Sequence, residues 1–420
     1  MRTGWIDFSQ NERNKLMQTL KLLETPGVLD ELGIGVIRDG YADILFPGLS
    51  TIQRRAKYFV LLPFIFNMAE KIKFDHAADV MPWIHKQEDM FVSTLTKNSK
   101  DKSGIIGYRT HQRGNSVKIK PSAIYWNGMK TFEILRDERL SISNVCNIIY
   151  SKQKRKKTVA IRTETKRNEG DGYDDDTAVN ENLAVFSWSN TNNMNAKDMA
   201  MELTVDEAEY LYEKITTAKK SAASLLAFML KKKCLFPSFN EIDDTILPDG
   251  LKKNYRLAKR FSEFIYGAHL YYNVIFFDDS NGADTTICEE YREWRAGFDF
   301  NGFDLQATLS NVKSDSCTNA FVNKFFEASK NDDPDTLKSI ITQREKSIKR
   351  ERAKLGKPHE YKYDNTKLIH HYKLNYRYKT AYTIINDILN GLEGINANNN
   401  GKDGTVARRT PTLFENAIND

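Results

Sequence analysis

The chain has 420 residues, of which 40% are hydrophobic and 28% charged, and its formal net charge is +6. This is the composition of an ordinary globular protein, and so small a net charge does not by itself indicate nucleic-acid binding. The four cysteines are scattered with no close pair, which argues against a disulfide framework. The longest apolar run, Phe59–Phe66, is far shorter than the ~20 residues of a membrane helix. We therefore expect a cytoplasmic, multidomain protein that does not enter a membrane.

Residues 1–118 are expected to form an N-terminal helical domain. Apolar spacing predicts a helix over Gln10–Glu24, and a second helical stretch over Asp30–Leu45 is weakened by three glycines. A Pro-Gly pair then interrupts the chain. After it, Ser50 followed three residues later by Gln53 has the pattern of a capping box and predicts the start of another helix.

The start of that helix would carry three cations, Arg54, Arg55 and Lys57. The positive end of a helix dipole repels cations, so an anion is expected nearby, either a carboxylate of the chain or a bound phosphate. Asp39 and Asp43 lie four residues apart on the preceding helix and are the simplest partners. The alternative for these two carboxylates is a metal or acid/base pair, but no further ligands can be placed.

Residues 119–203 would fit a winged-helix-like module. Two short helices are expected first, the earlier of them with Pro121 in its first turn, where proline is tolerated. Two β-like runs follow, Thr158–Thr165 and Leu183–Ser189, separated by a polar, acidic segment. The fold class expected for the whole chain is therefore mainly α with a small β element.

The first β-like run lies in a basic segment, Lys152–Arg167, which holds eight cations and the single acid Glu164. One hypothesis is a basic wing that tracks phosphates, and its contact residues would be Lys154, Arg155, Lys156 and Lys157. The acidic loop that follows would then act as a mobile competitor. The alternative is a solvated hairpin whose charges neutralise one another locally.

The end of the same run carries a pattern that suggests catalysis. Glu164 and Lys166 resemble the E-x-K half of a metal-dependent nuclease core, for which Asp137 is the only convenient upstream acid. Such triplets arise often by chance in a lysine-rich chain. His370 and His371 have no partner at metal-ligand spacing, and no phosphate-binding loop or nucleophile elbow is present. No metal or cofactor is expected, and the chain is more easily read as a non-enzyme.

Residues 204–395 are expected to form a C-terminal helical domain, and residues 396–420 a flexible linker and tail. The domain begins with Thr204 followed three residues later by Glu207, which has the pattern of a capping box. The domain contains the stronger basic segment, Arg344–Lys379, in which twelve cations outnumber four acids and five tyrosines are interleaved. Cations supply phosphate affinity and aromatic rings stack on bases, which predicts nucleic-acid contact here. Its expected contact residues are Arg350, Arg352, Tyr376, Arg377 and Lys379. The alternative is a surface helix whose tyrosines pack inward.

Several N-terminal segments resemble a family of uncharacterised bacterial proteins known as domain of unknown function 6361. The resemblance rests on Gly4–Ser9, Glu31–Asp39, Ala42–Gly48, Ser50–Phe59 and Pro121–Trp126. Members of that family tend to be encoded in bacterial defence islands, beside helicases and nucleases. The resemblance thus implies an accessory role near foreign DNA, and it supplies no catalytic residues.

Together these features predict a non-catalytic subunit of a bacterial anti-phage defence system, which binds DNA and works with a helicase or nuclease partner. Two alternatives remain. One is a metal-dependent nuclease, and the other is a protein-binding scaffold that does not contact nucleic acid.

Overall fold

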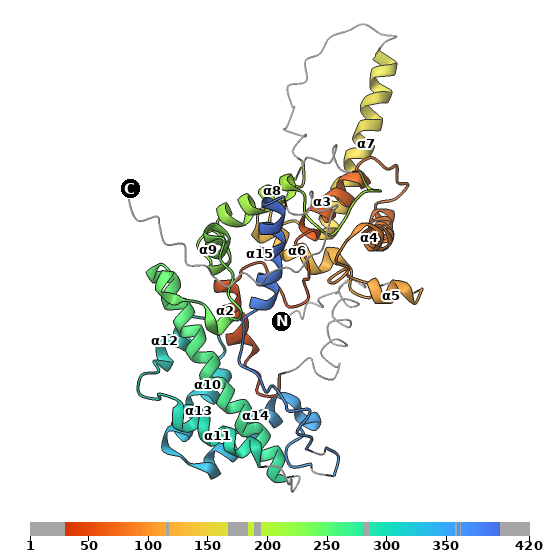
Figure 1. The fold of residues 1–420 in the computed structure, drawn as a ribbon. Helices are drawn as coiled ribbons and strands as arrows, with labels where there is room; N and C mark the ends of the chain where they lie inside the picture. The colour runs from red at the N-terminus through yellow and green to blue at the C-terminus, as the bar shows by residue number, and fades with distance from the viewer. Residues whose placement is uncertain are drawn as a thin grey trace, which may run out of the picture. The chain divides into compact units, whose positions relative to one another are not determined.

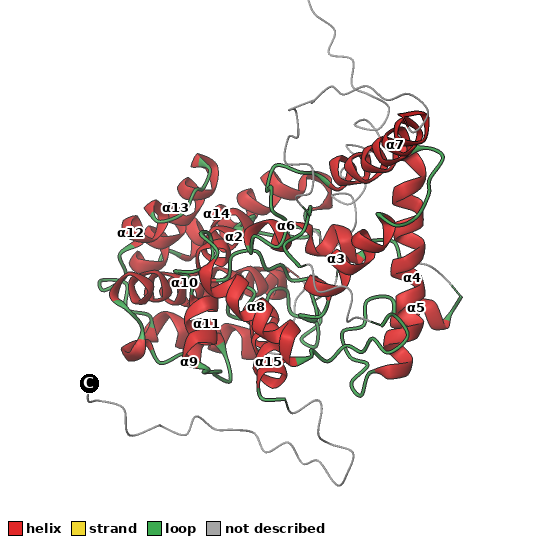
Figure 2. Ribbon diagram, turned by 90° about the horizontal axis from the view of Figure 1, so that it is seen from above, coloured by secondary structure: helices red, strands yellow, loops and turns green. Residues whose placement is uncertain are grey.

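Helices make up the regular secondary structure of the part of the chain that the computed structural model describes, and no strand occurs there (Figure 2). The described residues are 30–114, 117–166, 184–188, 195–279, 285–357, 359–361 and 363–394. For residues 155–166 only the backbone is described. Within these residues, no helix combines the length and apolar character needed to cross a bilayer.

The chain divides into two units, each built from two separate stretches of sequence. Unit 1 comprises Met1–Tyr41 and Asp244–Tyr376, and unit 2 comprises Ala42–Asp243 and Arg377–Asp420. The chain therefore passes from unit 1 to unit 2 inside helix α2 (Gly35–Leu45). The boundaries inferred from the sequence, after residues 118 and 203, do not coincide with this division.

Unit 1 is organised around the long helix α10, which is contacted by α11, α12 and α14 (Figure 1). Its elements are η4 (Asp244–Ile246), α10 (Asp249–Asp279), α11 (Thr286–Gly297), α12 (Leu305–Ser310), α13 (Ser316–Asn331), α14 (Pro334–Lys349) and η5 (Arg350–Arg352).

The core of unit 1 is aromatic. The ring of Phe264 on α10 is surrounded by those of Phe298, Phe303 and Phe325, at centroid distances of 5.1–5.7 Å. Gly267, one turn further along α10, lets the indole of Trp294 lie against the helix backbone, since a Cβ at this position would be 2.1 Å from the ring. Aromatic burial of this kind dominates the stability of such a core.

Unit 2 holds the remaining helices, with α15 packed on α8 and α9 and with α4 and α6 packed on α3. Its elements after α2 are α3 (Tyr58–Ala69), η1 (Ala77–Asp79), α4 (Val80–Asn98), α5 (Tyr108–Gln112), α6 (Pro121–Thr131), α7 (Ile142–Lys166), α8 (Val205–Thr217), α9 (Leu225–Lys232), η3 (Phe239–Glu241) and α15 (Tyr378–Leu392).

Helix α3 forms the centre of unit 2 because it is apolar on nearly every side, and ten of its twelve residues are buried. Phe59 meets Tyr125 of α6 and Phe132 edge to face, with ring centroids 4.9 and 5.2 Å apart. Pro63 lies inside α3 without ending it. A helix that is hydrophobic all round belongs in a core, so the elements packed around α3 are positioned by it.

The winged-helix-like module is not supported. Thr158–Thr165, expected as a strand, continues the helical backbone of α7 to Lys166. The helix begins where the Ser141 hydroxyl accepts the N–H of Asn144 (3.1 Å), and it satisfies its own backbone, whereas a strand would need a partner. Of the second run, residues 184–188 are described, and within them Phe186 forms an isolated antiparallel bridge with Leu135.

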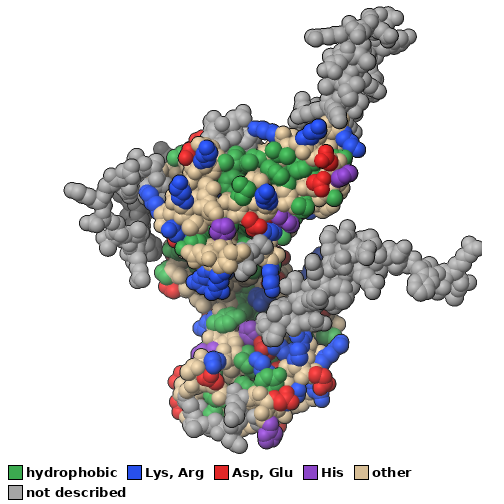
Figure 3. All heavy atoms as spheres, turned by 90° about the vertical axis from the view of Figure 1, so that its right-hand side faces the viewer, with side chains coloured by type: hydrophobic (Ala, Val, Ile, Leu, Met, Phe, Trp, Pro, Cys, Tyr) green, Lys and Arg blue, Asp and Glu red, His purple; other side chains and the backbone are tan. Residues whose placement is uncertain are grey.

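Other local expectations agree with the structure. Helix α2 covers the later part of the predicted Asp30–Leu45 stretch, and Pro121 occupies the first turn of α6. Thr204 and Glu207 form the capping box that opens α8. The predicted helix over Gln10–Glu24, the acidic loop and the tail 396–420 lie outside the described residues. The surface in Figure 3 shows Lys and Arg side chains spread among apolar and acidic ones, without one dominating patch.

Candidate functional site

The segment between Gly48 and Tyr58 is an irregular turn, so the helix predicted to start at Ser50 begins only at Tyr58. The Gln53 side chain accepts the N–H of Ser50 (3.2 Å), as in a capping box, but its amide donates back to the Gly48 carbonyl (3.1 Å). The next two backbone N–H groups, of Arg54 and Arg55, donate to the hydroxyl of Tyr125 at 2.8 and 3.0 Å. The turn is therefore held by side chains from elsewhere in unit 2, which replace helical carbonyls as acceptors.

Arg55 forms a buried ion pair with Asp387 of α15. Its Nε lies 3.0 and 2.9 Å from the two carboxylate oxygens, and the N–H of Ala56 donates to the same carboxylate at 2.9 Å. Burial alone lowers the pKa of Arg55, but the adjacent Asp387 charge leaves it above its ordinary value. Burial raises the pKa of Asp387 above its ordinary value, and the adjacent Arg55 charge offsets only part of this rise. With three donor contacts within 3.0 Å, the ionised carboxylate is the form that this geometry binds.

Lys57 is buried in the same way. Its ammonium group donates to both oxygens of Glu207, at 2.7 Å each, and both side chains are only 4% exposed. Glu207 also accepts the N–H of Thr204, so this pair joins the start of α3 to the start of α8. Two of the three predicted phosphate-binding cations thus serve to hold the fold.

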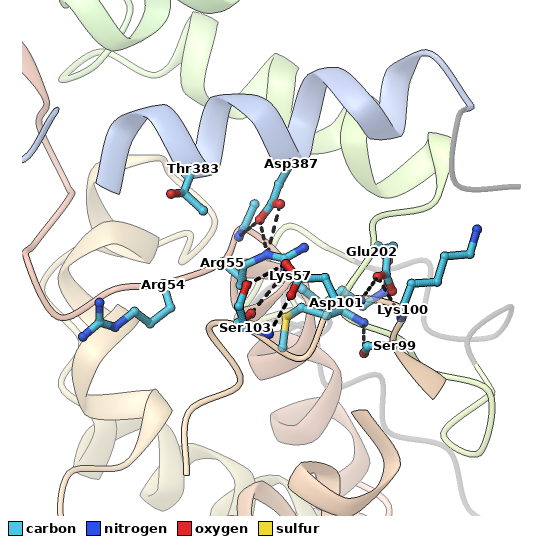
Figure 4. Close-up of polar contacts among 12 residues, drawn as sticks. Arg54, Arg55, Lys57, Ser99, Lys100, Asp101, Ser103, Glu202, Thr383 and Asp387 are labelled. Carbon is cyan, nitrogen blue, oxygen red and sulfur yellow. Dashed lines mark hydrogen bonds and ion pairs between the residues drawn. The ribbon is translucent and has the colours of Figure 1, made fainter. Parts of the chain in front are cut away.

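The anions that neutralise these cations are not the expected ones. Asp39 is bonded to its neighbour Arg38, and Asp43 to Arg377. The expectation that the chain supplies its own carboxylates is correct for Arg55 and Lys57, but the partners come from α15 and α8 rather than α2. Only Arg54 remains exposed, and Figure 4 shows it pointing away from the buried pairs.

Arg54 lines a groove on unit 2 with a volume of about 1200 Å³, which we call the basic groove. Its walls are formed by Ile52, Arg54, Ile124, residues 102–110 and residues 117–119. Three further exposed cations line it, Lys102, Arg109 and Lys118, and no lining residue is acidic. None of the four cations makes an ion pair with another described residue. Four like charges along one hollow focus a positive potential there.

The apolar part of the basic groove is as distinctive as its charge. Ile52 and Ile119 are 47% and 43% exposed, unusually large fractions for isoleucine. The half-buried ring of Tyr108, at the first position of α5, also faces this space. The basic groove therefore offers flat and apolar contact area between its cations.

The wall made by residues 101–107 is fixed by the buried Arg55. Arg55 Nη1 donates to the Ser103 carbonyl (3.1 Å) and to the carboxylate of Asp101 (3.0 Å). Gly104, with φ +79°, lies so close that a Cβ there would be 2.7 Å from the Arg55 Cγ. The carboxylate of Glu202 accepts the N–H groups of residues 100 and 101 (Figure 4). A buried ion pair thus supports the exposed groove from beneath.

The C-terminal basic segment is divided between the two units. Residues 344–376 belong to unit 1, whereas Arg377 and Lys379 belong to unit 2. Tyr376 is 2% exposed and its hydroxyl donates to the Ala258 carbonyl (2.7 Å), so its ring has no face open to a base. Arg377 is paired with Asp43 and also donates to the carbonyl of Leu49.

The remaining predicted contacts of this segment, Arg350 and Arg352 of η5 and Lys379 of α15, are exposed. The inward-packing alternative therefore accounts for Tyr376 and for Tyr378, whose side chains are buried.

The middle basic segment lies on α7. Lys154 is exposed, with its ammonium group 5.0 Å from the centre of the Tyr150 ring, and Arg155, Lys156 and Lys157 belong to the part of α7 described by its backbone alone. Glu164 and Lys166 also lie on this helix, so the strand that an E-x-K nuclease core requires is missing. Asp137 is paired with Arg139 at the surface. The predicted nuclease arrangement is not formed.

One cluster in unit 1 has metal-ligand chemistry that sequence spacing did not reveal. Carboxylate oxygens of Asp30 and Glu31 and a ring nitrogen of His370 lie within 4.8 Å of one another. Burial raises the pKa of Glu31, but hydrogen bonds from His370 and Lys349 outweigh this and bring the pKa below its usual range. Some 340 residues separate the two parts of this cluster, so no local pattern could have indicated it.

Lys102, Arg109 and Lys118 were also missed as binding residues, because nothing in the local sequence distinguishes this stretch from an ordinary exposed loop.

Comparison with known proteins gives one match. Residues 2–160 match the model of a family of unknown function, DUF6361. No curated protein and no solved structure matches the chain. The matched segment contains every residue that lines the basic groove, but not the partners of Arg55 and Lys57 on α15 and α8.

Proposed function

We propose that this chain binds nucleic acid through the basic groove, as a non-catalytic accessory subunit in the cytoplasm. The observation that carries the proposal is the set of four exposed cations, Arg54, Lys102, Arg109 and Lys118, in one groove without an acidic lining residue. Phosphate groups are the common cellular ligands for such a set, since each cation that meets a phosphate releases condensed counterions.

A single strand fits the lining better than a duplex. The exposed isoleucines and Tyr108 provide surfaces on which unpaired bases can stack, and in a duplex those base faces are covered. The exposed Arg350 and Arg352 of η5 offer an alternative phosphate-binding surface outside the basic groove. The resemblance to a family encoded in defence islands supports a place beside a helicase or nuclease that acts on foreign DNA.

The test measures affinity for fluorescent 20-nucleotide DNA and RNA single strands and for a DNA duplex, by anisotropy at 50 and 200 mM salt. Four phosphate contacts predict a slope of about −3 in log K against log salt for a single strand, or roughly a 50-fold loss between these concentrations. The variant Lys102→Gln/Lys118→Gln/Arg109→Gln should bind more weakly at 50 mM and lose only about threefold over the same range.

A matched control removes three exposed lysines of unit 1, Lys324→Gln/Lys330→Gln/Lys346→Gln, and has the same net charge as the groove variant. If both variants lose affinity equally, attraction is general rather than local and the basic groove is not the site. A variant Arg350→Gln/Arg352→Gln that alone abolishes binding would place the interface on η5. Absence of binding at 50 mM salt would favour the protein-binding scaffold.

A further inference from the structure

The cluster of Asp30, Glu31 and His370 lies in unit 1 and has no part in the basic groove. Asp30 and Glu31 directly precede α2, and His370 lies in the irregular segment after η5. His370 Nε2 is 2.6 Å from a carboxylate oxygen of Glu31. The two backbone N–H groups of Leu32 and Ile34 donate to the Asp30 carboxylate and orient it. Three ligand-type side chains are thus already held together.

A second histidine completes the group. His269, on α10, is 2% exposed, and neither of its ring nitrogens has a hydrogen-bond partner among the described residues. Its Nε2 lies 4.0 Å from the Asp30 carboxylate, and its ring is stacked on that of His370 with centroids 5.1 Å apart. Buried polar atoms nearly always find a partner, so an imidazole enclosed in this way needs an explanation.

We propose that unit 1 binds one Zn²⁺ ion between Asp30, Glu31, His269 and His370. Two imidazole nitrogens and two carboxylate oxygens form a four-ligand set typical of zinc, whereas Mg²⁺ and Ca²⁺ prefer oxygen ligands alone. Ligand atoms around tetrahedral zinc are about 3.3 Å apart, so the ligand atoms of Asp30, Glu31 and His370, which lie within 4.8 Å of one another, would have to approach by up to about 1.5 Å on binding. His269 Nε2, now 4.0 Å from the Asp30 carboxylate, would have to move toward the same point.

A bound ion would give the buried ring nitrogens of His269 a partner, which the ion pairs around Glu31 do not. Lys349 and Lys354 already approach Glu31, and these lysines with His370 satisfy its charge without any metal. They give no role to His269, whose desolvated nitrogens would then only destabilise the fold. Zinc with four protein ligands has no open position, so the site would be structural. It would tie the segment before α2 to α10 and to the segment after η5.

The experiment uses the full chain after chelator treatment and dialysis. Titration calorimetry with ZnCl2 should show one high-affinity ion per chain, and MgCl2 and CaCl2 should give no comparable signal. Zinc at a hundredfold excess over its Kd should raise Tm by roughly 5 °C or more. Absence of zinc binding, or binding of Mg²⁺ with equal affinity, would overturn the proposal.

Two variants locate the ion. His269→Leu should fold without metal at least as stably as the original chain, because it removes unpartnered buried nitrogens, and should lose zinc affinity at least tenfold. His371→Ala is the matched control, since His371 adjoins His370 but pairs with Glu290 (2.7 Å) instead. It should bind zinc unchanged. Zinc affinity that survives His269→Leu would place the ion elsewhere and refute the assignment.

If His269→Leu does not fold, the partly exposed His370→Ala takes its place, with the same expected loss and the same refuting result.

Discussion

Removing the carboxylate of Asp387 tests whether the buried pair with Arg55 holds the turn and the groove wall together. Asp387→Ala leaves the Arg55 Nε and the Ala56 N–H without their acceptor. The side chains of Arg55 and Asp387 are both less than 10% exposed, so water cannot readily replace the lost carboxylate. Breaking a buried pair from one side costs about 3–5 kcal/mol. Asp101 still accepts from Arg55 Nη1, so the lower end of that range, about 3 kcal/mol, is expected.

The assay is thermal unfolding, in which a loss of about 3 kcal/mol corresponds to a fall in Tm of roughly 6–12 °C. Asp43→Ala is the control, because its carboxylate is 66% exposed and Arg377 keeps the Leu49 carbonyl as a partner. It should cost less than about 1 kcal/mol. The double variant Arg55→Met/Asp387→Leu should be more stable than the single alanine variant. If Asp387→Ala costs no more than the control, the buried pair does not support the fold as argued.

Three further substitutions probe other parts of the molecule by denaturant unfolding. Lys57→Met leaves the buried carboxylate of Glu207 without its ion-pair partner and should lower the free energy of unfolding by about 3 kcal/mol. A loss under about 1 kcal/mol would contradict the burial described for this pair. Burial raises the pKa of the Glu88 carboxyl from 4.5 to about 7, so the folded state keeps this proton to a higher pH than the unfolded state does. The free energy of unfolding should therefore fall by about 3 kcal/mol as the pH rises from 4.5 to 7. Glu88→Gln should remove that decline and be the more stable form at pH 8, and an unchanged pH profile would refute the shift. Gly267→Ala forces a Cβ into the neighbouring indole ring and should cost about 1–3 kcal/mol, whereas Gly250→Ala, with open space around it, should be neutral or stabilising.

Local sequence patterns predicted the features that depend on neighbours in the chain. The Thr204 capping box, the first-turn position of Pro121 and most of α2 follow from a few adjacent residues, and they appear as expected. The strand expected at Thr158–Thr165 was wrong because β-branched content is a weak preference, and a helix needs no partner chain to satisfy its backbone. Ser50 and Gln53 form half of a capping box, but no helix follows directly. The next backbone N–H groups donate to the side chains of Tyr125 and Asp387, which hold this segment as a turn.

The amino-acid sequence by itself determined a mainly helical chain and an unusual concentration of cations near Arg54, and it indicated that some of these cations must have anionic partners. Only the tertiary structure decided which cations are buried and which are free to bind. Arg55 and Lys57 take carboxylates 332 and 150 residues away, while their neighbour Arg54 is left at the edge of the basic groove. The reason is physical: the charge of a side chain is set by its own chemistry, but its exposure and its partner depend on which distant elements pack against it.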